Sequence, residues 1–218
     1  MEHLPGDLRE YQPIQPRGTD WRGLFRKVWA PIAASVGLLI KFSFIFFKFA
    51  SIFVAVGAYA LIWGWRFGVG VVLLILVHEM GHYIEARRQG LHPALPVFIP
   101  FLGAYVAIRD ARINPWQHAL IALAGPFAGG VGAAAVWVVG ESEGSGLLQA
   151  LAYFGFMLNL INLAPLWILD GAQVTRSIGY LRRGGAPGRA TVIGVVYVGL
   201  AVALILGMFA AHVPQHRL

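Results

Sequence analysis

Long apolar stretches separated by short polar turns dominate this chain. Most of them reach the roughly 20 residues that a membrane-spanning helix needs. The first, 49–65, is a little shorter and ends at Trp63, Trp65 and Arg66, which are typical of a membrane interface. The others are 67–87, 116–139, 147–166 and 191–211. The pattern predicts an all-α polytopic membrane protein with about five transmembrane helices.

The segment 30–48 is apolar and rich in phenylalanine, but Lys41 and Lys48 interrupt it. We expect an interfacial amphipathic helix whose lysines snorkel to water. A spanning helix is the alternative, and it would make six spans. Residues 1–29 are polar and predict a flexible cytoplasmic tail, and 213–218 a short C-terminal tail. The membrane-embedded domain is then 49–212.

The segment 95–108 differs from its apolar neighbours. Prolines at 93, 96 and 100 disfavour a helix, and the β-prone runs 97–99 and 105–108 lie on either side of Gly103. This pattern predicts a short re-entrant β-hairpin. Such a hairpin is tolerated at membrane depth where protein or a wet cavity satisfies its backbone.

The composition supports a membrane protein. Hydrophobic residues make up 58% of the chain and charged residues 12%, whereas a soluble domain carries about a quarter charged residues. The chain has no cysteine, which excludes disulfides and thiolate metal sites. The net charge of +7 comes with no RNA- or DNA-binding motif, so the sequence predicts a lipid bilayer and no nucleic acid as partner.

The basic residues also predict an orientation in the cell membrane. They gather before the first span, between the second and third spans, and between the fourth and fifth spans, whereas the opposite turns hold Arg66, Glu141 and Glu143. Because cytoplasmic loops carry an excess of Lys and Arg, we expect the N-terminus in the cytoplasm.

A metal-binding motif, His78-Glu79-Met80-Gly81-His82, lies in the second predicted span. Residues four apart share a helix face, so both imidazoles can reach one ion, and neutral imidazole is a good zinc ligand. Glu79 follows the first histidine and can take a proton from an attacking water. The motif predicts a zinc site with Glu79 as general base.

The position of this motif sharpens its interpretation. Ionisable groups inside a span are costly unless they are paired or coordinated, and that favours a functional site over two ordinary bundle histidines. His78 lies eleven residues after Phe67, or about 17 Å along a helix. In a hydrocarbon core of about 30 Å, this places the site in the cytoplasmic half of the bilayer.

A catalytic zinc site needs a third protein ligand, and the chain offers few acids. Glu85 shares much of the His82 face but lies beside Arg87 and Arg88, which favours an interfacial position. Asp170 follows Pro165, which should break the fourth span and let the carboxylate turn inward. Asp170 is therefore the candidate ligand, with a helix cap as its alternative role.

Two motifs together carry a family resemblance. The His78–His82 motif, followed two spans later by Asn162-x-x-Pro165-x-x-x-Leu169-Asp170-Gly171, resembles the site-2 protease family of intramembrane zinc metalloproteases. The resemblance implies Zn²⁺ bound by His78, His82 and Asp170, Glu79 as general base, and Asn162 as a residue that holds the substrate backbone or the oxyanion. Ala172 and the Trp167-Ile168 pair depart from the family pattern. Many members also carry a PDZ or CBS domain, and we expect no room for either here, so the resemblance is to the compact form of the family.

The resemblance implies an enzyme that cuts transmembrane or membrane-anchored protein substrates. The predicted hairpin would present a strand edge to an extended substrate, or would merely plug the mouth of the site. A membrane metal-ion transporter and a non-catalytic zinc-binding scaffold are the alternatives. A transporter needs a continuous polar path, and the other spans hold few ionisable side chains.

Overall fold

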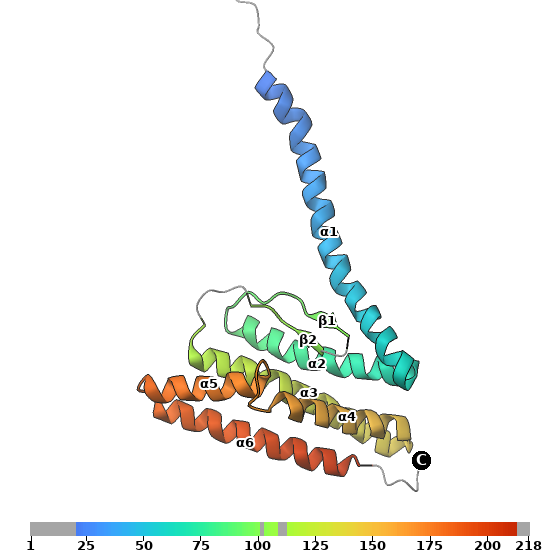
Figure 1. Ribbon diagram of the computed structural model, residues 1–218, viewed down its shortest axis with the longest axis vertical. Helices are drawn as coiled ribbons and strands as arrows, with labels where there is room; N and C mark the ends of the chain where they lie inside the picture. Colours follow the sequence, from blue (N-terminus) through green and yellow to red (C-terminus); the bar gives the residue numbers. More distant parts are fainter. Residues whose placement is uncertain (1–20, 101–102, 109–112, 213–218) are drawn as a thin grey trace, which may run out of the picture. The chain divides into compact units, whose positions relative to one another are not determined.

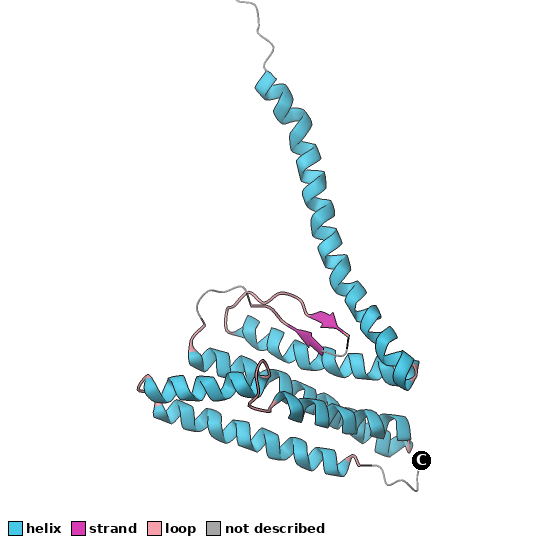
Figure 2. Cartoon of the chain, viewed as in Figure 1, coloured by secondary structure: helices cyan, strands magenta, loops and turns pink. Residues whose placement is uncertain are grey.

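The structure is a computed structural model that describes residues 21–100, 103–108 and 113–212. Its elements are drawn in Figures 1 and 2. The helices are α1 (Trp21–Trp63), α2 (Trp65–Arg88), α3 (Pro115–Glu143), α4 (Gly146–Asn162), α5 (Asp170–Arg183) and α6 (Pro187–Ala210), and the strands are β1 (Val97–Ile99) and β2 (Gly103–Tyr105). The chain falls into two units that divide between Ile45 and Phe46. The predicted site residues all lie in the second unit.

The N-terminal helix corrects three expectations. α1 is one helix of 43 residues, so residues 21–29 are helical and 30–48 is not a separate element. Pro31 lies inside the helix, which continues on both sides of it although proline lacks an amide hydrogen and its ring crowds the preceding turn. Lys48 does not reach for water but is buried, with 9% of its surface exposed. Residues 1–20 of the expected tail, and 213–218, lie outside the described part.

The second unit packs α2 to α6 side by side, as Figure 1 shows. α2 and α3 can approach closely because Gly81 has no side chain. A Cβ at this position would overlap the Ala124 carbonyl oxygen. One core cluster joins α3, α4, α5 and α6 around Phe156 and Leu204. A second joins the end of α1 to α2, α4 and Phe98 of β1.

The fourth predicted span is shorter than expected. α4 ends at Asn162, and a loop over 163–169 leads into α5, so Asp170 opens a new helix and the predicted basic loop 181–189 shrinks to three residues. Pro165 lies in that loop, where its ring and missing N–H are compatible with the turn. At 17 residues α4 is shorter than a typical span.

The predicted hairpin is present, although its second strand starts earlier than expected. β1 and β2 are antiparallel, with Val97 opposite Tyr105 and Ile99 opposite Gly103. Gly103 has a φ of 96°, a value that favours glycine. Figure 2 shows this small sheet among helices.

Helices dominate the described residues, and four of them are long and apolar enough to cross a membrane: α1, α2, α3 and α6. α4 is a shorter apolar helix. The prediction of an all-α polytopic membrane fold with a short β-hairpin is therefore confirmed. The protein is a multi-pass membrane protein.

Candidate metal centre

Three potential ligand atoms from two helices meet in the interior. His78 Nε2 and His82 Nε2, one turn apart on α2, are 3.1 Å from each other. Asp170 Oδ2, in the first turn of α5, is 3.2 Å from His78 Nε2 and 3.3 Å from His82 Nε2. The structure thus brings together the three residues that the sequence predicted as ligands.

The hydrogen bonds of the two Nδ1 atoms fix the tautomer of both histidines. His78 Nδ1 lies 2.7 Å from Asn159 Oδ1, and His82 Nδ1 lies 2.7 Å from the Ile121 carbonyl oxygen. Both partners are acceptors, so each Nδ1 carries a proton and donates it. In the neutral imidazoles each Nε2 therefore presents a lone pair towards the other and towards the Asp170 carboxylate.

This donor set fits zinc. Ligand atoms about 2.0–2.1 Å from a tetrahedral zinc ion lie roughly 3.3 Å apart, and the three atoms here are 3.1–3.3 Å apart. Three lone pairs at this separation repel one another unless a cation lies among them. Two imidazoles and one carboxylate also leave a fourth position open, as in catalytic zinc sites.

Asn159 is a site residue that the sequence analysis missed. Its side chain is fully buried, and its Nδ2 donates to the Gly155 carbonyl at 2.7 Å, so its Oδ1 must face His78. A hydrogen bond of this kind fixes the tautomer and the orientation of a ligating histidine. The one signal for it is that Asn159 is a buried amide within a predicted span, three residues before Asn162.

A cavity of about 380 Å³ adjoins the three ligands, and its wall includes Glu79, Asn162, and Ala104 and Tyr105 of β2. Glu79 is 5% exposed, and within the described ranges no side chain or backbone group hydrogen-bonds to its carboxylate. Asn162 Nδ2 donates to the Leu158 carbonyl at 3.1 Å, which leaves its second N–H and its Oδ1 for other partners. The cavity thus brings a buried carboxylate and an amide beside the ligand atoms.

A family comparison decides what kind of site this is. Residues 66–144 match Peptidase family M50, and this segment covers nearly all of α2 and α3 with His78, Glu79 and His82. The part of the chain that carries His78, Glu79 and His82 is thus similar to peptidase family M50. The match confirms the resemblance to site-2 proteases that the paired motifs indicated.

The names of curated proteins similar to this chain point to the same metal. The chain is 34% identical over 164 residues to Rip3 of Mycobacterium tuberculosis, covering 69% of this chain and 41% of that protein. It is 29% identical over 124 residues to sll0528 of Synechocystis, covering 52% and 32%. It is 28% identical over 145 residues to MJ0392 of Methanocaldococcus jannaschii, covering 62% and 40%.

All three names include the words zinc metalloprotease, without qualification only for the Methanocaldococcus protein. The chain spans one third to two fifths of the length of these relatives. The shared term supports zinc as the cofactor of this site, in agreement with the donor set.

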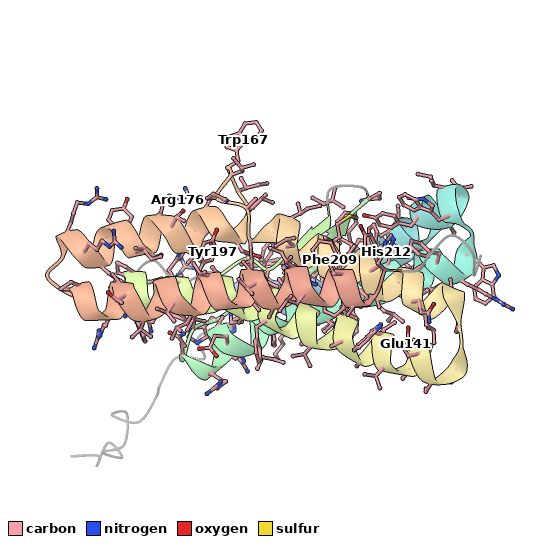
Figure 3. All side chains as sticks on the ribbon, turned by 90° about the horizontal axis from the view of Figure 1, so that it is seen from below. Glu141, Trp167, Arg176, Tyr197, Phe209 and His212 are labelled. Atoms are coloured by element: carbon pink, nitrogen blue, oxygen red, sulfur yellow. The ribbon has the colours of Figure 1, made fainter. Side chains whose placement is uncertain are left out.

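The loop 163–169 leads to Asp170, the candidate ligand that lies outside the matched residues 66–144. At its start, the Leu163 carbonyl accepts a hydrogen bond from the Tyr197 hydroxyl of α6, and a Cβ at Gly171 would overlap the same oxygen. Further along, the Trp167 carbonyl accepts from Arg176 Nη2 at 3.0 Å. Trp167 has a φ of 51°, and Figure 3 shows its side chain projecting away from the helices.

Among the described residues, the other acidic and histidine side chains do not join the three candidate ligands. Glu85 accepts hydrogen bonds from Arg88 at 3.2 Å and Gln89 at 2.8 Å, near the C-terminal end of α2. His118 lines a separate cavity together with Arg176. Asp110 lies outside the described residues.

Proposed function

We propose that this protein is an intramembrane zinc metalloprotease that hydrolyses peptide bonds of transmembrane or membrane-anchored proteins. The convergence of His78 Nε2, His82 Nε2 and Asp170 Oδ2 carries this proposal. The buried Glu79 carboxylate beside the same cavity separates this site from a purely structural metal site. The match of residues 66–144 to peptidase family M50 and the names of the similar proteins support the same reaction.

The residues around the cavity divide the reaction among them. A zinc ion held by the two histidines and Asp170 would supply Lewis-acid chemistry, polarising a carbonyl and acidifying water. Glu79 accepts the proton of the attacking water at a carboxylate oxygen and then returns it to the leaving amide nitrogen. Asn162, on the cavity wall, holds the substrate backbone or stabilises the oxyanion.

We further propose that the site lies in the cytoplasmic half of the bilayer and that the N-terminus is cytoplasmic. His78 is thirteen residues from the start of α2, or about 20 Å along its axis, and the basic Arg87 and Arg88 end that helix. In this arrangement 49–212 forms the protease domain. A substrate helix must unwind to reach the site, because a helix hides its carbonyl groups.

A proteomic comparison tests this function. Membranes that contain the wild-type protein should accumulate fragments cut within a span, and membranes that contain Glu79→Gln should not. Glu79→Gln should still bind zinc, because it keeps all three ligands. Glu85→Gln is the matched control, since it removes a carboxylate from the same helix but away from the cavity, and it should cleave like the wild type.

The two alternative functions give different results in this comparison. A metal transporter would carry zinc into liposomes whether residue 79 is Glu or Gln, and a scaffold would show no difference between the membranes. Equal cleavage by the wild type and Glu79→Gln would remove Glu79 from the reaction.

A further inference from the structure

Two polar side chains on α1 are hydrogen-bonded to the hairpin. Lys48 Nζ donates to the Leu95 carbonyl oxygen at 3.1 Å. Ser51 Oγ accepts from the Phe98 N–H at 3.2 Å and donates to the Lys48 carbonyl at 2.6 Å. Lys48 and Ser51 are each 9% exposed, so these bonds are shielded from water. The two bonds to the hairpin each connect positions 47 residues apart in the chain.

The bond from Lys48 reaches the hairpin where its pairing is interrupted. Val97 pairs with Tyr105, and Pro93 pairs with Ile108. Position 93 lies four positions before 97 on one leg, whereas position 108 lies only three positions after 105 on the other. The leg that includes Leu95 therefore carries one extra residue, a β-bulge, which leaves backbone groups outside the ladder. The Lys48 ammonium group binds one of them.

The bond from Ser51 fixes which way the hairpin faces. The Phe98 N–H points to α1, away from β2, so Phe98 and Ala104 form a pair without mutual hydrogen bonds. In such a pair the N–H and C=O of Ala104 point away from β1, towards the other edge of β2. Ala104 also lines the catalytic cavity. α1 thus occupies one edge of the hairpin, and the edge beside the metal site belongs to β2.

We propose that Lys48 and Ser51 are positioning residues that hold the hairpin in the register and orientation in which β2 forms the wall of the catalytic cavity. Lys48 acts on the bulge and Ser51 acts on the strand. For its effect on catalysis, this inference rests on the proposed function. Neither residue touches the metal ligands, so their effect is on how a substrate binds rather than on zinc.

Helix α1 offers matched controls for both residues. Lys41 and Ser43 lie on the same helix but are exposed, and neither has a hydrogen bond to another described residue. Lys48→Met is compared with Lys41→Met, and Ser51→Ala with Ser43→Ala. Each pair removes the same functional group from the same helix, and within each pair only one position contacts the hairpin.

Hydrogen exchange of the purified full-length protein in detergent micelles tests the positioning directly. Amides of 95–99 should exchange about tenfold faster in Lys48→Met and about threefold faster in Ser51→Ala, because a charge-assisted bond contributes more than a neutral one. Amides of α3 and α6 should be unchanged. Lys41→Met and Ser43→Ala should match the wild type. Equal exchange of 95–99 in all five proteins would overturn the inference.

A cleavage assay tests the consequence for binding. The probe is a synthetic transmembrane peptide with a Gly–Ser break at its centre and a fluorophore–quencher pair, reconstituted with the enzyme in liposomes. Lys48→Met and Ser51→Ala should raise KM about fivefold or more, with kcat and zinc affinity within twofold of the wild type. A fall in kcat with unchanged KM would overturn the role in substrate binding. Failure of the wild type to cut any membrane protein would count against the proposed function, while hydrogen exchange would still decide the role of Lys48 and Ser51.

Discussion

Asn159 Oδ1 accepts a hydrogen bond from His78 Nδ1 at 2.7 Å, and this bond connects α4 to the metal centre. The amide cannot rotate freely, because its nitrogen donates to Gly155 within the same helix. His78 is therefore held as the tautomer that offers Nε2 to a metal. We therefore expect Asn159, a residue outside the proposed ligand set, to influence how well that set holds a metal.

Replacing Asn159 should weaken zinc binding. Asn159→Leu keeps the side-chain volume but leaves the His78 N–H buried without an acceptor, at a cost of about 1–3 kcal/mol. Loss of such a partner typically lowers metal affinity about 10–100-fold. Competition with a fluorescent chelator in detergent micelles would measure this change.

Asn162→Leu is the control for that measurement. Asn162 bonds to a carbonyl of its own helix and does not contact either histidine. The Asn162→Leu variant should bind zinc with wild-type affinity but cleave substrate more slowly than the wild type. If both variants kept wild-type zinc affinity, the hydrogen bond from Asn159 would have no role in the metal site.

Two glycines of α3 make room for the metal centre, and alanine should not be tolerated at either. A Cβ at Gly129 would overlap the amide of Asn159, and a Cβ at Gly125 would overlap the ring of His82. Gly129→Ala should therefore reproduce the zinc affinity of Asn159→Leu, and Gly125→Ala should lose zinc binding more severely. Gly194→Ala on α6 has open space around it and should bind zinc normally. Wild-type zinc affinity of Gly125→Ala would show that α2 and α3 can separate at little cost.

The two candidate histidine ligands could be predicted because their spacing in the sequence matches one turn of a helix. Two histidines four residues apart must share a helix face, and an apolar run around them makes a functional site the best explanation. Asp170 could be reached by elimination, since so few acids lie near a span. The hairpin could be predicted from its prolines and β-branched residues.

The parts that the sequence did not predict depend on contacts between distant segments. In the sequence, Asn159 is one polar residue among others in a predicted span. Its role depends on the packing of α4 against α2, which brings its Oδ1 to His78 Nδ1. Lys48 looks like a snorkelling lysine until the Leu95 carbonyl is found 3.1 Å from it. The length of α1 was missed because a proline and two lysines mimic a helix boundary, although none of them breaks the helix.

Zinc should stabilise the protein, and this effect should need Asp170. The ion would join α2 to α5, so at a free zinc concentration one hundred times Kd it should add about 2.7 kcal/mol. Thermal unfolding in micelles, with and without zinc, would detect the shift. Asp170→Asn removes the carboxylate and should abolish it, and magnesium should not replace zinc at a site with two imidazoles. A full zinc shift in Asp170→Asn would exclude this residue as a ligand.

The hydroxyl group of Tyr197 should matter for zinc binding although it lies on another helix. It donates to the Leu163 carbonyl at the start of the loop that ends at Asp170. Tyr197→Phe removes that hydrogen bond, worth about 1 kcal/mol, and keeps the ring. The loosened loop should hold Asp170 less well, so zinc affinity should fall about threefold to tenfold in chelator competition. Tyr180→Phe is the control, because Tyr180 is exposed on α5 and its hydroxyl has no hydrogen-bond partner among the described residues. An equal loss in both variants, or in neither, would mean that the Tyr197 bond does not position the ligand.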